Sequence, residues 1–549
     1  MATDAERFCP HEQHLPFVMH PFFALAFFFA LSVADPAYAQ VAVTILHTSE
    51  HHGTIQPIEH GPFAGLGGVE RRAAQIKQIR QEVEHLLVVD SGDLLMGTAM
   101  SSVYRGEVDI AAMNLMSYDA VAVGNHDFDF GTRYLKNLRK EATFPFLCTN
   151  VRPQDPDVCQ RHAIKHLGHV RVGLIGLIGK KNYPDAFNRA VVREVEFVDP
   201  ILAAKQAVGE LRERVEILVA ITHQDTEEDL ALAKAVPGLD VIIGGHTEGF
   251  DGLVPPGQTN PVEGRVELTG VGPVFVKTHR QGRTLGRLDL LYHEKTIMVA
   301  EAHNLPVSAA VSSDPDIAQL VRDYARRLDE QTNQVIGKAA HAFEGENRDI
   351  RTRETNLGNL LADLARQHTG AEIGLVNSGM IRSSMPAGPV TLKRVMEVLP
   401  FDSSLTSFTV TGAALKAALE NSVSRLPEAS GRFLQVSGLT VVFDPTAPSG
   451  TRITSVQVNG APLNPARRYK VASDNFIAEG GDGYTMFLQV TDRRDYQIPL
   501  RDVLLSALKA GPLAAKVEAR ITPRASVSPG HEILLGEKVN LLRLRSVEG

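Results

Sequence analysis

Five short apolar runs in the first half of the chain each lead into residues that commonly bind metal ions. The runs lie at 41–48, 86–89, 120–123, 217–221 and 239–243 and have the length and composition of buried strands. Segments with helical periodicity accompany them at 68–83, 109–117, 132–141, 199–214 and 227–236. This alternation of strands and helices predicts an α/β fold with a largely parallel sheet. In such a sheet the carboxyl ends of the strands gather at one edge.

The residues that follow these runs are carboxylates, imidazoles and amides. Glu50 and His52 follow the first run, Asp90 and Asp93 the second, Asn125 and His126 the third, His223 the fourth, and His246 and Glu248 the fifth. Carboxylates that converge repel one another unless cations lie among them. The repeated pattern therefore predicts a metal centre at the edge of the sheet.

The motifs that carry this pattern resemble, in the same order, those of the calcineurin-like metallophosphatases, and more specifically the two-domain 5′-nucleotidase family. The motifs are ILHTSEHHG (45–53), DSGD (90–93), GNHDFDFG (124–131), THQD (222–225) and GGHTE (244–248). The resemblance covers nearly all of the chain after residue 40. It implies a four-layer metallophosphatase-type β-sandwich flanked by helices, joined by a helix to a second, α+β nucleotide-binding domain.

The resemblance also implies two divalent metal ions, which could be manganese, zinc, cobalt, iron or magnesium. Asp93 would bridge the two ions. Glu50, His52 and Glu248 would bind the first ion, and Asn125, His223 and His246 the second. A metal-activated hydroxide would attack phosphorus, which agrees with the way two metals clamp an in-line displacement. His126 would assist at the phosphoryl group, and Asp129 would orient His126.

Two positions depart from the family pattern, and the family assigns both to the first metal. Glu50 stands where an Asp is usual, and Glu248 stands where a His or Gln is usual. The additional carboxylate oxygen predicts a harder first site that favours manganese, iron or magnesium over zinc. A less positive centre acidifies its bound water less, so we expect a higher pH optimum.

Four runs in the second half resemble motifs of the family's C-terminal nucleotide-binding domain: NRDIRTRETNLGN (347–359), VNSGMIR (376–382), LPFDSS (399–404) and DNFIAEGGDGY (474–484). By this resemblance Phe401 and Phe476 stack on the base, and Asp482 accepts hydrogen bonds from ribose. Arg351 and Arg382 would bind phosphate, for which a guanidinium is well shaped, and Asn377 would lie near the base.

The ends of the chain and its charge complete the organisation. Residues 1–39 read as a signal peptide cut after Ala39, because an apolar run at 22–33 precedes small residues. We expect a metallophosphatase domain at 40–308, a linker helix within 309–337, a substrate-binding domain at 338–524 and an extension of unassigned role at 525–549. Cys148 and Cys159 could form a disulfide or remain thiols. The net charge of −8 argues against a nucleic-acid polymer as partner.

The sequence therefore predicts a periplasmic or secreted phosphohydrolase without a membrane anchor. Its substrates would be nucleoside 5′-monophosphates, with UDP-sugars and nucleoside di- and triphosphates as further candidates. Three alternatives remain open: a 2′,3′-cyclic nucleotide phosphodiesterase with 3′-nucleotidase activity, a thiosulfohydrolase, and a nucleotide-binding protein with an impaired metal site. The oligomeric state is open as well.

Overall fold

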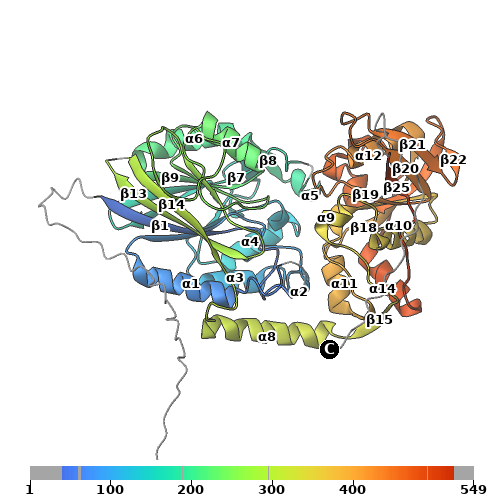
Figure 1. Cartoon of the computed structure of the whole chain (residues 1–549), viewed down its shortest axis with the longest axis horizontal. Coiled ribbons are helices and arrows are strands. Elements are labelled where there is room, and N and C mark those ends of the chain that lie inside the picture. The colour runs from blue at the N-terminus through green and yellow to red at the C-terminus, as the bar shows by residue number, and fades with distance from the viewer. Residues whose placement is uncertain are drawn as a thin grey trace, which may run out of the picture. The chain divides into compact units, whose positions relative to one another are not determined.

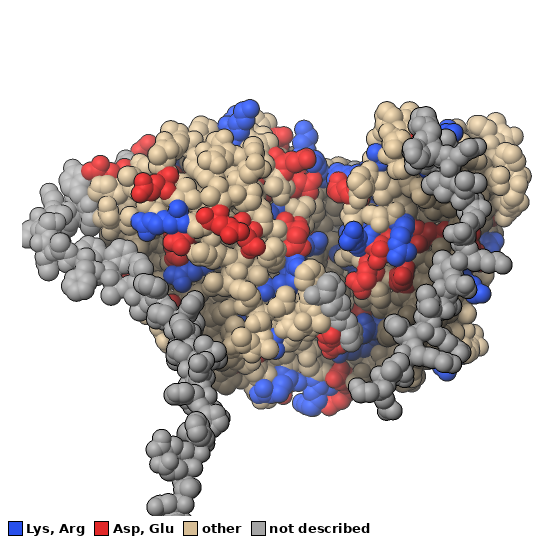
Figure 2. Space-filling view, in the orientation of Figure 1, with Lys and Arg blue, Asp and Glu red and all other residues tan. Residues whose placement is uncertain are grey.

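The computed structural model describes residues 40–524 apart from 60–62, 185, 188, 295 and 491. The predicted signal peptide and the 525–549 extension therefore lie outside the described residues. Within the described part of the chain, no helix is both long and apolar enough to cross a bilayer. Acidic and basic side chains are interspersed on the face that Figure 2 shows, without a broad basic surface there.

The first domain contains a mixed seven-stranded sheet in the order β11-β14-β13-β1-β2-β3-β4. The neighbours from β1 to β4 pair in parallel, whereas β13, β14 and β11 add antiparallel strands beside β1. The strands are β1 (Val41–Thr48), β2 (Leu86–Asp90), β3 (Ala120–Ala122), β4 (Phe146–Leu147), β11 (Gly264–Glu267), β13 (Thr284–His293) and β14 (Thr296–Pro306).

A second, five-stranded sheet packs against the first and has the order β12-β10-β9-β7-β6. Its pairs are parallel except that between β6 and β7. The strands are β6 (His162–Leu167), β7 (Val170–Ile178), β9 (Ile217–His223), β10 (Val241–Gly244) and β12 (Val274–Lys277), and a separate pair joins β5 (Val151–Pro153) to β8 (Val195–Phe197).

Helices cover the outer faces of both sheets and give the four layers seen in Figure 1. Successive residues of β2 show why: Leu87 and Val89 face the second sheet, whereas Leu86 and Val88 face the helices. A strand buried on both faces reads as a continuous apolar run. The helices are α1 (Val69–Glu82), α2 (Ala99–Tyr104), α3 (Glu107–Leu115), α4 (Thr132–Glu141), α5 (Arg189–Val192), α6 (Pro200–Leu211), α7 (Thr226–Ala235) and α8 (Pro315–Thr332), with short 3-10 turns η2 (His126–Phe128) and η3 (Arg212–Arg214).

The prediction of one largely parallel sheet was wrong in its topology, whereas the implied β-sandwich is confirmed. The five ligand-bearing strands divide between the two sheets, with β1, β2 and β3 in one and β9 and β10 in the other. An apolar run shows that a strand is buried but not which strands pair with it. The carboxyl ends nevertheless converge, because they meet across the sandwich rather than along one sheet.

The linker helix predicted within 309–337 is observed as α8 (Pro315–Thr332), which leads into the second domain (Figure 1). Asp314 caps it by accepting hydrogen bonds from the amides of Asp316 and Ile317, and Pro315 occupies the first turn. Its apolar face, with Ile317, Val321 and Leu328, belongs to the core of the first domain beside α1 and α3. The linker helix is therefore packed along its length rather than bridging free solvent.

The second domain is built on a five-stranded sheet in the order β19-β16-β23-β18-β24, with apolar clusters on both faces. A four-stranded sheet, β22-β21-β20-β25, and the pair β15-β17 accompany it. The strands are β15 (Val335–Ala339), β16 (Ile373–Asn377), β17 (Gly388–Thr391), β18 (Ser404–Thr411), β19 (Leu434–Ser437), β20 (Leu439–Phe443), β21 (Ile453–Val458), β22 (Ala461–Pro462), β23 (Arg468–Asp474), β24 (Arg494–Pro499) and β25 (Ile521–Pro523). The helices are α9 (Asn347–Ile350), α10 (Asn356–Thr369), α11 (Leu392–Val398), α12 (Gly412–Ser422), α13 (Asn475–Ala478) and α14 (Leu500–Ala510), with 3-10 turns η4 (Ser378–Met380), η5 (Gly481–Gly483) and η6 (Thr485–Phe487).

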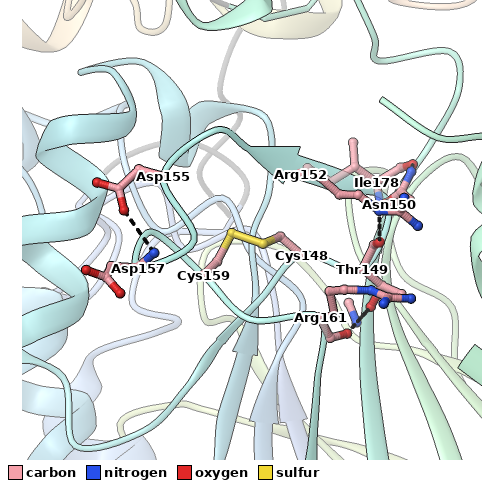
Figure 3. Close-up of a disulfide and its surroundings, with 10 residues drawn as sticks. Cys148, Thr149, Asn150, Arg152, Asp155, Asp157, Cys159, Arg161 and Ile178 are labelled. Atoms are coloured by element: carbon pink, nitrogen blue, oxygen red, sulfur yellow. Dashed lines mark hydrogen bonds between the residues drawn. A yellow bond between two sulfur atoms is a disulfide. The ribbon is translucent and has the colours of Figure 1, made fainter. Parts of the chain in front are cut away.

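Cys148 and Cys159 form a disulfide, which decides between the two states that the sequence left open (Figure 3). Their Cα atoms are 5.9 Å apart, and the bond closes a loop in which the amide of Asp157 donates to the Asp155 carboxylate. Disulfides persist in oxidising compartments and are rare in the cytosol of mesophiles.

Candidate metal centre

The loops that follow β1, β2, β9 and β10 bring their polar side chains together in two overlapping groups. Glu50, His52 and Asp93 offer ligand atoms that lie within 4.8 Å of one another, and so do Asp93, His223 and His246. Asp93 belongs to both groups. Asp93, which the resemblance implies as the bridging ligand, is thus the residue that the two groups share.

The backbone at this centre is held in conformations that ordinary residues seldom adopt. The φ angles are 54° at Glu50, 48° at His52, 57° at Asp93 and 66° at His246. Non-glycine residues in the left-handed region carry strain, which clusters at functional sites where the surrounding structure enforces it. Gly124 is needed for close approach, because a Cβ there would lie 2.3 Å from the Asp93 Oδ1 atom.

Asp127 ties the loop after β2 to the loop after β3. Its carboxylate accepts hydrogen bonds from the backbone amides of Asp93 at 3.0 Å, Leu94 at 2.9 Å and Gly124 at 2.8 Å. Asp127 is buried, so these bonds are sheltered from water. Asp127 therefore positions Asp93 without belonging to either ligand group.

The second group fits a divalent metal ion. The His223 Nδ1 atom lies 2.8 Å from the Ser91 carbonyl oxygen and donates to it, so Nε2, which lies 3.3 Å from the Asp93 Oδ2 atom, is the nitrogen that a metal ion would bind after displacing its proton. The Asn125 Oδ1 atom is buried and has no hydrogen-bond partner among the described residues. A buried acceptor without a donor is costly, and a cation would satisfy it. The donor set of one carboxylate, one amide oxygen and two imidazoles is typical of transition-metal sites.

The charges in the centre are strongly coupled. Although burial opposes ionisation, His223 and Arg280 lower the pKa of Glu50 to about 2. Burial raises the pKa of Asp93, but His223, His126 and His52 together outweigh it and hold the pKa of that carboxyl well below its usual range. In turn, Asp93 and Glu50 overcome burial and raise the pKa of His223 to about 10. Burial and the neighbouring His223 lower the pKa of His246 to about 4.

The first group contacts an arginine that the sequence analysis did not single out. The Arg280 Nη2 atom lies 3.1 Å from Glu50 Oε2 and 3.1 Å from His52 Nε2. Glu248 belongs to neither ligand group. Its two oxygens accept hydrogen bonds from Arg283 at 2.5 and 2.6 Å, and one of them lies 2.7 Å from His279 Nδ1.

His126 stands beside the two ligand groups. Its Nδ1 atom lies 2.7 Å from Asp129 Oδ2, and its backbone amide donates to Asp93 Oδ1 at 2.9 Å. Burial disfavours its imidazolium, but Asp129 and Asp93 together raise the pKa of His126 above its usual value. A protonated imidazole next to a metal centre can stabilise an anion or donate a proton.

The second domain contributes two guanidinium groups at this place. The Arg382 Nη2 atom is 3.4 Å from His126 Nε2, and its guanidinium carbon is 5.3 Å from the Phe401 ring centre. Burial and Arg280 lower the pKa of Arg382. Burial and Arg382 lower the pKa of Arg351 to about 9. Partly buried guanidinium groups that repel one another can bind an anion such as phosphate.

The remaining predicted substrate residues all belong to the second domain. The Phe401 ring lies 5.8 Å from the His126 ring, next to the metal groups. Phe476 packs on the second domain's core close to Gly481. The Asn377 Nδ2 atom donates to Asp482 Oδ2 at 2.8 Å, and Asp482 has a left-handed φ of 51°.

The residues that sequence reasoning missed, His279, Arg280 and Arg283, all follow strand β12. This strand is parallel to β10 and ends at the same edge of the second sheet. The run THRQGR after the apolar residues 274–276 carried the same signal as the five strands that were identified. Arginine does not bind metal ions, so Arg280 and Arg283 do not fit the metal-ligand pattern of the other five strand ends.

Comparison with known proteins places this geometry in a family. The model for calcineurin-like phosphoesterases matches residues 43–248, and the model for the 5′-nucleotidase C-terminal domain matches residues 335–489. The chain is 31% identical over 519 residues to a snake venom 5′-nucleotidase from Crotalus adamanteus, covering 87% of each protein. It is 30% identical to the human 5′-nucleotidase, covering 89% of this chain and 92% of that one.

A solved structure agrees with these sequence relatives. The crystal structure of a 5′-nucleotidase precursor from Thermus thermophilus superimposes with a TM-score of 0.78 at 32% identity, over 88% of this chain and all of that chain. Both halves of the chain, their order and their fold are thereby accounted for. The chain belongs to the 5′-nucleotidase family and is a phosphoric ester hydrolase that combines a calcineurin-like metallophosphatase domain with a 5′-nucleotidase C-terminal domain.

Proposed function

We propose that this chain is an exported, metal-dependent phosphohydrolase that releases phosphate from nucleoside 5′-monophosphates. The observation that carries the proposal is the juxtaposition of a metal-type ligand group with His126 and Arg382. The disulfide supports export. UDP-sugars and nucleoside di- and triphosphates are further candidate substrates, because they also carry a phosphoryl group on the 5′-oxygen of a nucleoside.

Asp93, Asn125, His223 and His246 are the residues that would hold a divalent ion. A bound ion would supply Lewis-acid stabilisation of phosphoryl charge and would acidify a water molecule. Arg382 and Arg351 would bind the non-bridging oxygens of phosphate. The imidazolium of His126, held by Asp129, would neutralise charge at the phosphoryl group and deliver a proton to the leaving nucleoside oxygen.

The nucleoside end would lie on the second domain. Phe476 offers an aromatic face for the base, and Asp482 and Asn377 form a hydrogen-bonded pair for ribose and base. Stacking on an aromatic ring tolerates any base, because every base has a π-face. Specificity for a 5′-phosphate would then follow from the distance between these groups and the metal centre.

A substrate panel tests the proposal directly. Purified protein is given AMP, 3′-AMP, 2′,3′-cyclic AMP, UDP-glucose, ATP and thiosulfate-type esters, each with manganese, cobalt, zinc or magnesium. We expect AMP to have the largest kcat/KM for phosphate release. Faster turnover of 3′-AMP or the cyclic nucleotide would favour the phosphodiesterase alternative. AMP that binds but is not cleaved with any metal would favour a nucleotide-binding protein.

Metal affinity should rise with pH, because a metal ion must displace a proton from His223. Asp93 and Glu50 outweigh burial and raise the pKa of this imidazole to about 10, so it is protonated at neutral pH in the metal-free chain. The pKa of His246 is lowered to about 4, so that residue has no proton to lose there. One released proton makes the apparent affinity rise about tenfold per pH unit below pH 10.

Calorimetric titration of the chain with Mn²⁺ at pH 7, in two buffers of different ionisation heat, measures this proton. About one proton should be released per ion bound. His303→Gln is the matched control, because His303 is half-exposed and pairs with Glu301 away from the centre. Binding without proton release would contradict the assigned charge state of His223.

Phe476→Ala should weaken nucleotide binding while leaving the metal centre intact. Loss of one stacked aromatic face costs about 1–3 kcal/mol per base, so KM for AMP should rise roughly 5- to 150-fold. Phe476→Tyr keeps the ring and should keep KM near that of the wild type. Hydrolysis of p-nitrophenyl phosphate, which lacks the base, should be unchanged in both variants. An unchanged KM for AMP in Phe476→Ala would remove Phe476 from the base site.

A further inference from the structure

In the first ligand group, both carboxylate oxygens of Glu50 already have hydrogen-bond partners. The Glu50 Oε1 atom accepts a 2.6 Å hydrogen bond from the backbone amide of His246, and Oε2 accepts from Arg280. Glu248 is held by Arg283 and His279. In the second group, by contrast, the Asn125 Oδ1 atom has no partner among the described residues.

The tautomer of His52 determines whether its Nε2 atom can accept a hydrogen bond from Arg280. The His52 Nδ1 atom lies 2.9 Å from the Met96 carbonyl oxygen and 3.2 Å from that of Leu95, so Nδ1 carries the proton and donates. Nε2 is therefore a lone pair, and Arg280 Nη2 donates to it at 3.1 Å. The same nitrogen that would bind a metal ion through His52 is used as a hydrogen-bond acceptor.

The loop that carries Arg280 is fixed in this place by its backbone. The amide of Gln281 donates to the Glu50 carbonyl oxygen at 2.9 Å, and Arg283 Nε donates to the Arg280 carbonyl oxygen at 3.0 Å. Arg283 is buried and lies over the Phe63 ring, with its guanidinium carbon 4.0 Å from the ring centre. The backbone of the turn that carries Arg280 is thus held in place by these contacts.

The two residues that depart from the family pattern, Glu50 and Glu248, both pair with basic residues of this loop. Glu50 and Glu248 are each paired with one arginine of the same turn, Arg280 and Arg283. The side chain of Glu50 is longer than that of Asp. One of its oxygens accepts from the His246 amide and the other accepts from Arg280. A guanidinium supplies one fixed positive charge and cannot be lost to solvent or chelator.

We infer that Arg280 occupies the first cation position of the centre, so that the phosphohydrolase proposed above, on which this inference rests, holds a single divalent ion at the second position. Asp93, Asn125, His223 and His246 bind that ion. Glu50 and His52 hold the guanidinium, which faces the reacting phosphate as a permanent cation. Glu248 is a partner of Arg283 and His279 and binds no metal.

The test counts metal ions in the full chain. Protein stripped with chelator is saturated with Mn²⁺, and the ions per chain are measured by elemental analysis and native mass spectrometry. Electron paramagnetic resonance separates an isolated Mn²⁺ ion from an exchange-coupled pair. The wild type should bind one ion with an isolated signal. Two ions with a coupled signal in the wild type would overturn the inference, and so would the absence of any bound ion.

Arg280→Ala tests the role of the guanidinium itself. Removing it frees Glu50, His52 and Asp93, so a second ion should bind and a coupled signal should appear. Arg326→Ala, on the exposed face of α8, is the matched control and should still bind one ion. A count of one in Arg280→Ala would show that the ligands themselves exclude a second ion and would overturn the role of Arg280.

Phosphate release from AMP, measured on the same samples, separates this inference from the proposed function. Turnover with one ion per wild-type chain supports both. Turnover with two ions overturns the single-ion centre and leaves the proposed function standing. One ion without turnover of any nucleotide overturns the proposed function, while the assignment of Arg280 stands on the ion count.

Discussion

Asp93→Asn is expected to lower kcat/KM for AMP by at least about a thousandfold. Asp93 belongs to both ligand groups, and its Oδ2 atom lies 3.3 Å from His223 Nε2. An amide has nearly the same shape but lacks the charge that binds a cation. If the metal contributes about 4 kcal/mol of transition-state stabilisation, its loss corresponds to that factor.

Metal binding should fail together with activity in Asp93→Asn. Mn²⁺ affinity measured by calorimetry should fall strongly, and the proton released per ion should decrease. The second effect follows because Asp93 is the largest of the influences that raise the pKa of His223 against its burial. Asp157→Asn is the matched control, since Asp157 is 69% exposed and pairs with Lys136 at the surface. Asp93→Asn with wild-type metal affinity and a rate within tenfold of the wild type would refute the proposed centre.

Strand ends were the part of the site that the sequence predicted best. A buried strand is apolar, and the first polar residues after it must lie at the edge of a sheet, so Glu50, Asp93 and His223 could be placed without coordinates. Element types and approximate limits followed from periodicity, as for α4, where 132–141 was predicted and observed. The helical limits of α3 shifted by two residues, from 109–117 to 107–115, because helix ends depend on local caps.

Strand pairing could not be predicted from the same patterns. β1 is bordered by β2 in parallel and by β13 in antiparallel orientation, although β13 is distant in sequence. The apolar residues of β13 fit either sheet, because both sheets bury residues on the shared inner face. The choice between the two sheets depends on packing across the sandwich, and the sequence of one strand gives no information about that packing.

The hydrogen-bond partners of Glu50 and Glu248 also could not be predicted from the sequence. Both residues were interpreted as ligands that make the first metal site more oxygen-rich, and the charge argument assumed that each faced a metal ion. In the structure both face arginines from the turn after β12. Net charge at a site depends on which residues tertiary structure brings near it, and Arg280 is more than two hundred positions from Glu50.

His126→Gln is expected to lower kcat for AMP by about 10²–10⁴, the range associated with one general acid–base group. Metal content should not change, because His126 belongs to neither ligand group. The same variant with p-nitrophenyl phosphate should lose less, since that leaving group departs without a proton. His303→Gln is again the control and should keep wild-type kcat.

The pH profile gives His126 a signature that a merely structural role would not have. Asp129 and Asp93 outweigh burial and raise the pKa of His126, so its imidazolium persists to higher pH than an ordinary histidine, and activity that needs this proton falls as pH rises through the raised pKa. This alkaline limb of kcat/KM should be absent in His126→Gln. In Asp129→Asn it should move to lower pH by about one unit or more, because an opposite charge is lost 2.7 Å from Nδ1. An alkaline limb that is the same in all three proteins would assign the titration to another group and remove His126 as the proton donor.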